Sequence, residues 1–405
     1  MIGVKPRLNK TVAAVTTSAL LLMAVPVVGV ASTSGAAGKP TYVIGYEGPL
    51  TGSNAQLGLN MVFAVQLAIN HANASHTLPF NLQMATYDDQ GSNTLSPAQA
   101  QAAIHNKKLV AIVGPAFSGA TRAAEVYYSA AHIATVSPSA TAAALATGKK
   151  NNNFMRVVAG DDVQGAADAN FLVKQKNVKN LYVIDDGSYY GAGLAAVVAQ
   201  QAKSDGAKVT TNSYPESSSC PPGTASPTQY SAAATQIMSS GATGIFYGGY
   251  YCDFGLLLGA LSSAGFKGAI MSGDGSLSPA LIAGTSPASA ANNVFLSVAG
   301  GGNSTLTGKL AAQYKAIAHF PAANATYAAQ SYDATNMIIA ALKQVYNKKV
   351  TVLQLRPRLI TALHKLHYRG VTGMLSFQSN GDLNAKTVVD FSQVQNGQIV
   401  SIGHS

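Results

Sequence analysis

Short runs of β-forming residues alternate with longer stretches of helical periodicity along most of this chain, and this alternation limits the possible folds more than any other feature. The helical stretches repeat apolar residues every three or four positions, as Met61, Val65 and Ile69 do. Strands separated by helices form mainly parallel sheets that helices cover on both faces. We predict strands at 42–46, 80–84, 109–113, 181–184, 208–210 and 244–247, and helices at 58–72, 97–106, 194–202, 230–238 and 324–346.

Two such series of strands and helices lie on either side of about residue 160. A chain of 405 residues is too long for one ordinary hydrophobic core, and its 47% hydrophobic content is too high for a disordered protein. The predicted fold class is therefore α/β, with two doubly wound parallel-sheet lobes joined by a hinge. Near the end of the chain, 374–377 and 388–391 are predicted as the strands of a hairpin that turns at 379–382.

The first 31 residues have the three parts of a secretory signal. Lys5, Arg7 and Lys10 form a basic segment, the apolar run 19–30 follows, and small residues occupy 29–31 at the expected cleavage site. Because the uncharged stretch is also long enough to cross a bilayer, a retained membrane anchor is the alternative. We expect the mature protein to be extracytoplasmic, either secreted or held in the periplasm or cell envelope.

The two cysteines, Cys220 and Cys252, bear on anchoring and on oxidation. A lipid-anchored protein carries a cysteine directly after its cleavage site, and neither cysteine lies there, so we expect no lipid anchor. In an oxidising compartment two cysteines commonly pair, which predicts a Cys220–Cys252 disulfide. Cys220 lies in a segment rich in proline and serine, 215–227, which is predicted as a long loop.

Charge and motif content argue against nucleic-acid binding and against catalysis. The net charge is +10, but the basic residues occur in scattered pairs without interleaved aromatic residues, as on a solvated surface. The chain has no Walker loop and no Gly-x-Ser-x-Gly elbow. His364 and His367 lie three residues apart, and we interpret them as a surface pair. We therefore predict no metal site, no cofactor and no enzymatic activity.

Hydroxyl side chains follow two consecutive strands. Ser118 stands between the strand at 109–113 and the next helix, and Ser139 and Thr141 follow the next strand. Taken singly, Ser118 and Thr141 could simply be helix caps, as Ser96 is predicted to be for the helix at 97–106. Together, the two strand ends present free N–H groups, helix dipoles and hydroxyls to one crevice, which suits an anion. Because these loops carry no Lys or Arg, a small carboxylate fits better than a phosphate.

These loops belong to a longer resemblance that runs over nearly the whole chain after the signal. In order and spacing, the matching segments resemble the leucine/isoleucine/valine-binding proteins, a branch of the type I periplasmic-binding proteins. The resemblance implies a monomer that captures a small amino acid, most often a branched-chain one, between two lobes and delivers it to the permease of an ABC importer. The segments are 48–52, 57–58, 87–89, 114–121, 138–141, 189–191, 246–250, 271–275, 372–377 and 380–382.

Carried over residue by residue, the resemblance implies a ligand site. Ser118 and Thr141 would bind the α-carboxylate, and the Ser139 carbonyl and Asp274 would bind the α-ammonium. Two tyrosines would close over the ligand from the other lobe. The implied site is Leu57, Ser118, Ser139, Thr141, Tyr190, Tyr250 and Asp274. The implied lobes are 41–160 with about 298–371, and about 161–297 with 372–405.

Two positions depart from the family pattern. Leu57 stands where an aromatic residue is frequent, and Asp274 stands where Glu is frequent. Both would shape the ligand pocket, so amides, urea and aromatic acids are alternative ligands. A ligand-sensing receptor domain is an alternative function, and a secreted hydrolase with Ser118 as nucleophile is a further one.

Overall fold

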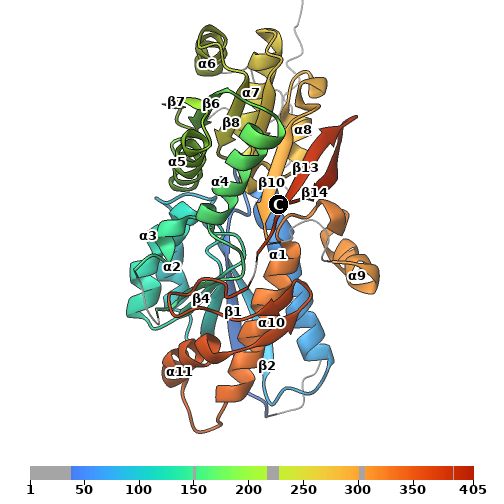
Figure 1. The fold of residues 1–405 in the computed structure, drawn as a ribbon. Coiled ribbons are helices and arrows are strands. Elements are labelled where there is room, and N and C mark those ends of the chain that lie inside the picture. The colour runs from blue at the N-terminus through green and yellow to red at the C-terminus, as the bar shows by residue number, and fades with distance from the viewer. Residues whose placement is uncertain (1–37, 149–151, 217–227, 301–305, 386) are drawn as a thin grey trace, which may run out of the picture. The chain divides into compact units, whose positions relative to one another are not determined.

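In the computed structural model, residues 40–405 form one unit that contains two open sheets covered by helices (Figure 1). It describes residues 38–148, 152–216, 228–300, 306–385 and 387–405. Residues 1–39 form a separate unit, of which only Gly38 and Lys39 are described. The predicted signal, Cys220 and nearly all of the predicted loop 215–227 lie outside the described residues, so the signal and the disulfide stay predictions.

The first sheet is entirely parallel, in the order β2-β1-β3-β4-β5. Its central strand β3 (Leu109–Val113) is buried along its whole length, as a continuous apolar run between two helical layers must be. The other strands are β1 (Thr41–Gly48), β2 (Asn81–Asp88), β4 (Ala134–Ser137) and β5 (Phe154–Arg156). The helices of this lobe are α1 (Ala55–Ala74), α2 (Ser96–Ile104), α3 (Ser118–Ala130), α9 (Gly308–Ala318), α10 (Ala328–Val345) and α11 (Val352–Lys365).

The second sheet has the order β14-β13-β10-β9-β8-β6-β7. Five strands are parallel, β6 (Asn180–Asp185), β7 (Lys208–Ser213), β8 (Gly244–Gly248), β9 (Ala269–Ser272) and β10 (Phe295–Ala299). The last two, β13 (Val389–Gln395) and β14 (Gln398–His404), are antiparallel. The helices of this lobe are α4 (Asp161–Asn170), α5 (Tyr189–Ser204), α6 (Thr228–Ser239), α7 (Tyr251–Ser263) and α8 (Pro279–Gly284). The two-lobed α/β prediction is thereby confirmed, with an antiparallel edge that it did not include.

Within the described residues, the chain passes from one lobe to the other three times. It does so after β5, after β10, and between the small β11–β12 pair and β13. β11 (Tyr368–Gly370) and β12 (Gly373–Leu375) pair only with each other, in antiparallel register. Short 3₁₀ segments complete the described chain at η1 (Ala143–Leu145), η3 (Asp274–Ser276), η4 (Ala288–Ala291) and η5 (Ala322–Asn324), and a π segment η2 (Phe171–Gln175) extends α4.

The predicted late hairpin is wrong. β12 pairs with β11, whereas β13 pairs with β10 and β14, so the two predicted strands lie in different sheets. Pairing across the turn at 379–382 is limited to the single bridge between Phe377 and Leu383. The turn instead binds β5, because the Gly381 carbonyl accepts from the Arg156 N–H and Asp382 binds the Arg156 guanidinium. Turn residues therefore mark a crossing between lobes at this point.

Ser96 is not the cap predicted from the sequence. It lies within α2, whose N-cap is Leu95, and its hydroxyl donates to the Glu47 carboxyl group at 2.5 Å. Glu47 is fully buried and also accepts from the Tyr128 hydroxyl. Burial raises the pKa of Glu47 to about 8, although these two hydrogen bonds oppose the shift. At neutral pH the group is therefore largely a neutral hydrogen-bonding residue of the first lobe's core.

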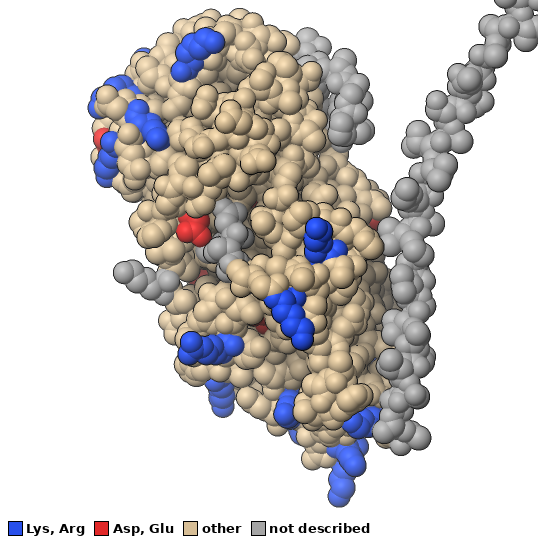
Figure 2. All heavy atoms as spheres, turned by 90° about the vertical axis from the view of Figure 1, so that its right-hand side faces the viewer, with Lys and Arg blue, Asp and Glu red and all other residues tan. Residues whose placement is uncertain are grey.

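Acidic residues gather in the interior and basic residues on the surface. Eight of the sixteen Asp and Glu residues are buried, whereas Arg156 and Arg356 are the buried cations among the described residues. Figure 2 shows Lys and Arg spread over one face with few acidic groups between them. Such a surface attracts anionic partners more than cationic ones. Among the described residues, no helix combines the length and the apolar character that a membrane span requires.

We expect Glu47→Gln to flatten the pH dependence of stability. The folded-state pKa of about 8 lies above the ordinary value of 4.5, so the folded protein retains a proton that the unfolded chain releases between these values. Stability therefore falls as pH rises through this interval. The introduced glutamine cannot ionise. We therefore expect the free energy of unfolding of the variant at about pH 8 to exceed that of the wild type by on the order of 2–5 kcal/mol.

The measurement is denaturant unfolding at a series of pH values from about 5 to 8. Asp162→Asn, which alters an exposed carboxyl group on α4, is the control and should follow the wild type. Parallel pH profiles for the wild type and Glu47→Gln would contradict the assignment.

Candidate functional site

The first lobe contributes two loops that follow adjacent parallel strands. The loop after β3 leads into α3, and the loop after β4 runs toward the short segment η1. Because parallel strands end at the same edge of a sheet, the two loops lie side by side there. They carry Phe117 and Ser118 on one and Ser139 and Thr141 on the other. The sequence prediction placed its hydroxyl groups at this edge, and the structure agrees.

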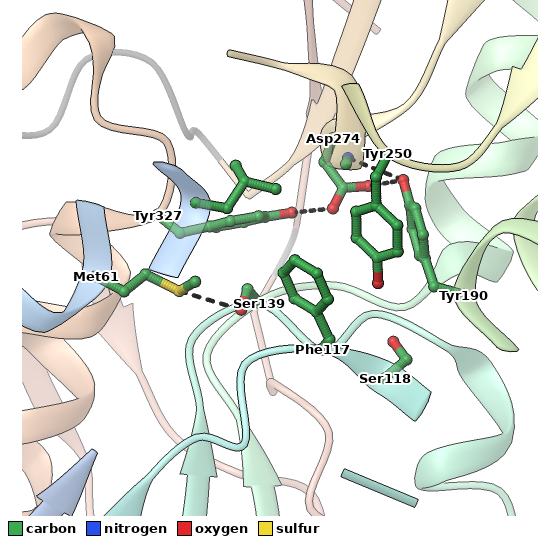
Figure 3. A pocket seen from close by; sticks show the side chains of 10 residues that line it. Met61, Phe117, Ser118, Ser139, Tyr190, Tyr250, Asp274 and Tyr327 are labelled. Carbon is green, nitrogen blue, oxygen red and sulfur yellow. Dashed lines mark hydrogen bonds between the residues drawn. The ribbon is translucent and has the colours of Figure 1, made fainter. Parts of the chain in front are cut away.

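A small, nearly filled pocket lies between these loops and the second lobe (Figure 3). Residues of both lobes form its wall, and each of them is buried. The pocket therefore represents a closed arrangement of the cleft. Its lining residues are Leu57, Met61, Phe117, Ser118, Ser139, Tyr190, Tyr250, Asp274, Gly275 and Tyr327.

Six of the seven predicted site residues line this pocket, namely Leu57, Ser118, Ser139, Tyr190, Tyr250 and Asp274. Thr141 does not. It is fully buried and lies next to the Asp161 carboxyl group. Its carbonyl accepts from the Asp161 N–H at 2.8 Å and from the Arg156 guanidinium at 2.7 Å. Thr141 thus supports the loop that carries Ser139.

Asp274 is the one acidic side chain among the described residues of the pocket wall. It begins η3 after strand β9 and is 3% exposed. Tyr190 donates to Oδ1 at 2.8 Å, and Tyr327 donates to Oδ2 at 2.6 Å (Figure 3). Burial raises the pKa of Asp274, and the two tyrosine hydrogen bonds counteract that rise. Among the described residues that line the pocket, none is Lys or Arg.

The backbone approaches Tyr190 closely at Gly275, which follows Asp274. A Cβ atom at this position would lie 2.7 Å from Cε1 of Tyr190 and 2.8 Å from the Gly249 carbonyl oxygen. The Gly275 N–H also donates to the Tyr190 hydroxyl at 3.0 Å. A residue with a side chain would displace the ring, so glycine is needed to hold the phenol against the carboxylate.

Aromatic rings close one side of the pocket. Phe117, the N-cap of α3, stacks on Tyr250, the N-cap of α7, with 4.3 Å between ring centroids and 11° between planes. Tyr250 also packs against Tyr190 at 5.2 Å. Beyond the Phe117–Tyr250 pair lies a wider and more polar hollow, lined in part by Asn54 and Asp186. The stacked pair therefore separates the inner pocket from the outer part of the cleft.

The hydroxyls of the first lobe are already oriented by the protein. Ser118 Oγ accepts from the Ala142 N–H at 3.2 Å, which ties the two loops together. The Ser139 hydroxyl donates to the Ala116 carbonyl at 2.7 Å and contacts Sδ of Met61 at 3.2 Å. Ser118 is the first residue of α3, so it is not that helix's cap. The free N–H groups at the start of this 13-residue helix point toward the cleft end of the lobe.

Sequence reasoning missed four lining residues. Met61 follows Leu57 by one helical turn on α1, so the helical period could have indicated it. Phe117 and Gly275 lie within the matching segments but were not singled out. Tyr327 had no sequence signal, because a left-handed backbone (φ 66°, ψ 6°) places it. Such a conformation costs a tyrosine of order 1–3 kcal/mol, which surrounding contacts must offset.

Arg156 organises the pocket loops from behind. It is 1% exposed, and its Nη1 donates to the carbonyls of Ala140, Thr141 and Ala142 at 2.7–3.2 Å. Its Nε and Nη2 bind one oxygen of Asp382 at 2.7 and 2.6 Å. Asp382 lies in the third crossing between the lobes. One guanidinium therefore links the ligand-facing loop to a segment that joins the two lobes.

The described side chains of the pocket wall are carboxyl, hydroxyl, aromatic and aliphatic groups. Among the described residues, no group of three or more His, Cys, Asp or Glu side chains is placed to hold a metal ion. The described lining residues include no histidine, and Ser118 Oγ bonds a backbone N–H. A lining of aromatic and aliphatic side chains with a few polar groups is typical of a binding pocket.

Residues 41–398 match the family described as periplasmic binding protein. A leucine-, isoleucine-, valine-, threonine- and alanine-binding protein of Pseudomonas aeruginosa is 28% identical over 63% of this chain. The matched part spans 65% of that relative's length, just under two thirds.

Two solved structures share the fold. A branched-chain amino-acid transporter substrate-binding protein of Streptococcus pneumoniae, in complex with isoleucine, has a TM-score of 0.74 and 22% identity over 90% of this chain and 99% of its own. A solute-binding protein of R. palustris, in complex with benzoate, also has a TM-score of 0.74, with 14% identity over 90% of this chain and 96% of its own.

We expect Asp382→Ala to lower the free energy of unfolding by about 2–4 kcal/mol, because it leaves the buried Arg156 guanidinium without its carboxylate. Asp205→Ala is the matched control. It removes the partner of Lys174, whose side chain is 59% exposed, and should cost less than the change at Asp382 because Lys174 remains solvated. Denaturant unfolding of the two variants makes the comparison. Equal losses would show that Arg156 does not depend on Asp382.

Proposed function

This chain belongs to the periplasmic binding protein family, and from that premise we propose that it captures an amino acid between its lobes for delivery to an ABC importer. One observation carries the proposal. Asp274 is a buried carboxyl group in the wall of a closed pocket whose described lining contains no Lys or Arg. A buried charge without a partner is unfavourable, so the pocket favours a ligand that brings a cationic group.

The ammonium group of an α-amino acid meets this requirement beside Asp274 and the Ser139 carbonyl. Its carboxylate would then face Ser118 and the first N–H groups of α3, where the helix dipole favours an anion. Thr141 would act from behind, through the loop it supports. Tyr190 and Tyr250 would close over the zwitterion, and each charge-assisted bond would contribute roughly 1.5–3 kcal/mol.

Leu57, Met61 and Tyr327 supply an apolar end for the ligand side chain. The Pseudomonas relative is named for leucine, isoleucine, valine, threonine and alanine, and the Streptococcus structure contains isoleucine. These names support a branched-chain amino acid as the preferred ligand. The neighbour with benzoate supports the alternative of an aromatic acid. Asp274 favours the amino acid, because benzoate has no cationic group to place beside it.

The same proposal includes the setting of the protein. We infer an extracytoplasmic monomer without a lipid anchor, exported by the signal at 1–31, that docks on a membrane permease. It acts by binding and not as an enzyme. The lobes would comprise 41–160 with about 298–371 and about 161–297 with 372–405, since the three crossings lie near these limits. Closure of the lobes is then a population shift that the ligand stabilises.

We expect Asp274→Ala to weaken binding of the preferred amino acid by about 30-fold or more, since the ammonium loses its charged partner in a desolvated pocket. Thr141→Ala should cost less, on the order of 1–3 kcal/mol, because Thr141 acts only through the loop that carries Ser139. The measurement is calorimetry on refolded protein freed of bound ligand, with leucine, isoleucine, valine, threonine and alanine.

Asp162→Ala, which removes an exposed carboxylate of α4, is the control and should bind as the wild type does. Unchanged affinity in Asp274→Ala would refute the amino-acid proposal and point to an amide, urea or an aromatic acid as the ligand. The amino-acid proposal would also be refuted if none of the five amino acids bound and an amide, urea or an aromatic acid did bind.

A further inference from the structure

The end of the first lobe that lies opposite the pocket is rich in cations and poor in acids. The pocket loops follow β3 and β4, whereas this end lies where the parallel strands of the first sheet begin. Helix α11 lies at this end (Figure 1). Two segments contribute to it, 90–124 and 334–381, and neither contains any Asp or Glu. The second segment has seven Lys and Arg residues, so its cations have no acidic neighbour along the chain.

Buried Arg356 holds α11 against the turn that enters β3. This side chain is 3% exposed, and its Nε donates to the Leu109 carbonyl at 3.0 Å. Its Nη2 donates to the Asn106 carbonyl at 3.4 Å. The exposed side chains of Lys107 and Lys108 lie between these two anchoring carbonyls in the chain. Both lysines are therefore held beside the helix.

The loop between α10 and α11 adds further cations at the same end. It begins at Tyr346, whose ring packs against Tyr42 of β1 and Phe80 just before β2. Arg358 and Lys365 lie two turns apart along one side of α11. Figure 2 shows Lys and Arg side chains gathered at the lower end of the molecule, with no acidic side chain among them on the face shown.

Six exposed cations thus share this end of the first lobe, and we call them the basic end. None of them forms a salt bridge with a described residue. Their charge is therefore available to a partner. The basic end consists of Lys107, Lys108, Lys348, Lys349, Arg358 and Lys365.

An exposed leucine lies among these cations. Leu353, in the first turn of α11, is 71% exposed, whereas Leu355, Leu359 and Leu363 of the same helix are fully buried. A membrane interface takes up both kinds of group, since anionic headgroups attract cations and the boundary with the acyl chains accepts apolar side chains. A soluble polyanion would contact the cations but offers no apolar phase for the leucine.

The corresponding end of the second lobe is an internal comparison. It also has exposed lysines where strands β6, β7 and β9 begin. There, however, Asp205 binds Lys174 at 2.8 Å, and the Lys176 ammonium lies over the rings of Phe171 and Phe295. Two cations of that end thus already have partners within the protein.

We propose that the basic end docks the protein on an anionic phospholipid membrane. Its cations bind the headgroup phosphates, and Leu353 enters the interface beside them. The pocket stays clear of the bilayer, because it lies at the opposite ends of the same strands. The docking does not rest on the proposed function. Together with that function, it would keep a receptor without a lipid anchor close to its permease.

The test is sedimentation with vesicles of phosphatidylglycerol and phosphatidylcholine in equal parts, and with vesicles of phosphatidylcholine alone, in the absence of any amino acid. The protein begins at residue 32, because the apolar run 19–30 would itself enter lipid, and it keeps the whole unit 40–405. We expect binding to the anionic vesicles only, and we expect added salt to weaken it.

The first variant neutralises four lysines of the basic end. It should lower partitioning into anionic vesicles at least about a hundredfold, since each cation near an anionic surface contributes roughly fivefold. Because the four side chains are exposed, thermal unfolding should not change. The substitutions are Lys107→Gln, Lys108→Gln, Lys348→Gln and Lys349→Gln.

The matched control neutralises four exposed lysines of the second lobe and so has the same net charge. It should bind anionic vesicles within about threefold of the wild type. Equal losses in the two fourfold variants would overturn the proposal, because overall charge would then explain the binding. The control substitutions are Lys179→Gln, Lys203→Gln, Lys208→Gln and Lys267→Gln.

Leu353→Ser distinguishes a membrane from a soluble polyanion. It should weaken vesicle binding about threefold and leave retention on immobilised polyphosphate unchanged. No binding of the wild type to anionic vesicles would overturn the proposal. Equal vesicle binding by the wild type and Leu353→Ser, with tight binding to polyphosphate, would also overturn it and identify a soluble polyanion as the partner. Titration of the lysine variant with L-isoleucine should match the wild type, so docking and amino-acid binding can fail separately.

Discussion

The carboxylate of Asp274 is the group on which the rest of the site depends. Two tyrosine hydroxyls, one from each lobe, hold it beneath the surface, and no basic side chain of the pocket neutralises it. Hydrogen bonds from neutral hydroxyls reduce the cost of a buried charge but do not remove it. A ligand that carries an ammonium group therefore gains more binding free energy here than an uncharged ligand does. Its binding is also coupled to closure of the cleft between the lobes.

The scaffold serves this arrangement through its strand ends. Adjacent parallel strands bring the Ser118 and Ser139 loops to one edge, and α3 adds its N–H groups there. Arg156 fixes the Ser139 loop by three carbonyls and joins it to Asp382 in the third crossing. The buried cation Arg156 thus holds both the pocket loop and the segment that connects the lobes. A structural change in the third crossing can therefore affect ligand binding through Arg156, even though the crossing does not contact the ligand.

The sequence predicted correctly those features that follow from the periodicity of apolar residues and from the order of strands and helices along the chain. Alternating strands and helices predicted both sheets, and strand β3 begins and ends as expected. Residues on matching segments, such as Ser118 and Asp274, were found at the pocket, although their roles remain predictions. The prediction failed where contacts between residues distant in the chain determine which strands pair. Residues 379–382 have the composition of a hairpin turn, but they bind Arg156. Tyr327 could not be found, since its place follows from a backbone conformation and from the packing of α10.

The central claim is that the ligand's ammonium group, and not its hydrocarbon or carboxylate part alone, completes the pocket. The most direct test is a paired calorimetric titration of the refolded, ligand-free chain with L-isoleucine and with 3-methylpentanoic acid, which lacks only the amino group. The account predicts that isoleucine binds and that the des-amino acid binds at least about a hundredfold more weakly. Equal affinity for the two compounds, or tighter binding of the des-amino acid, would contradict it.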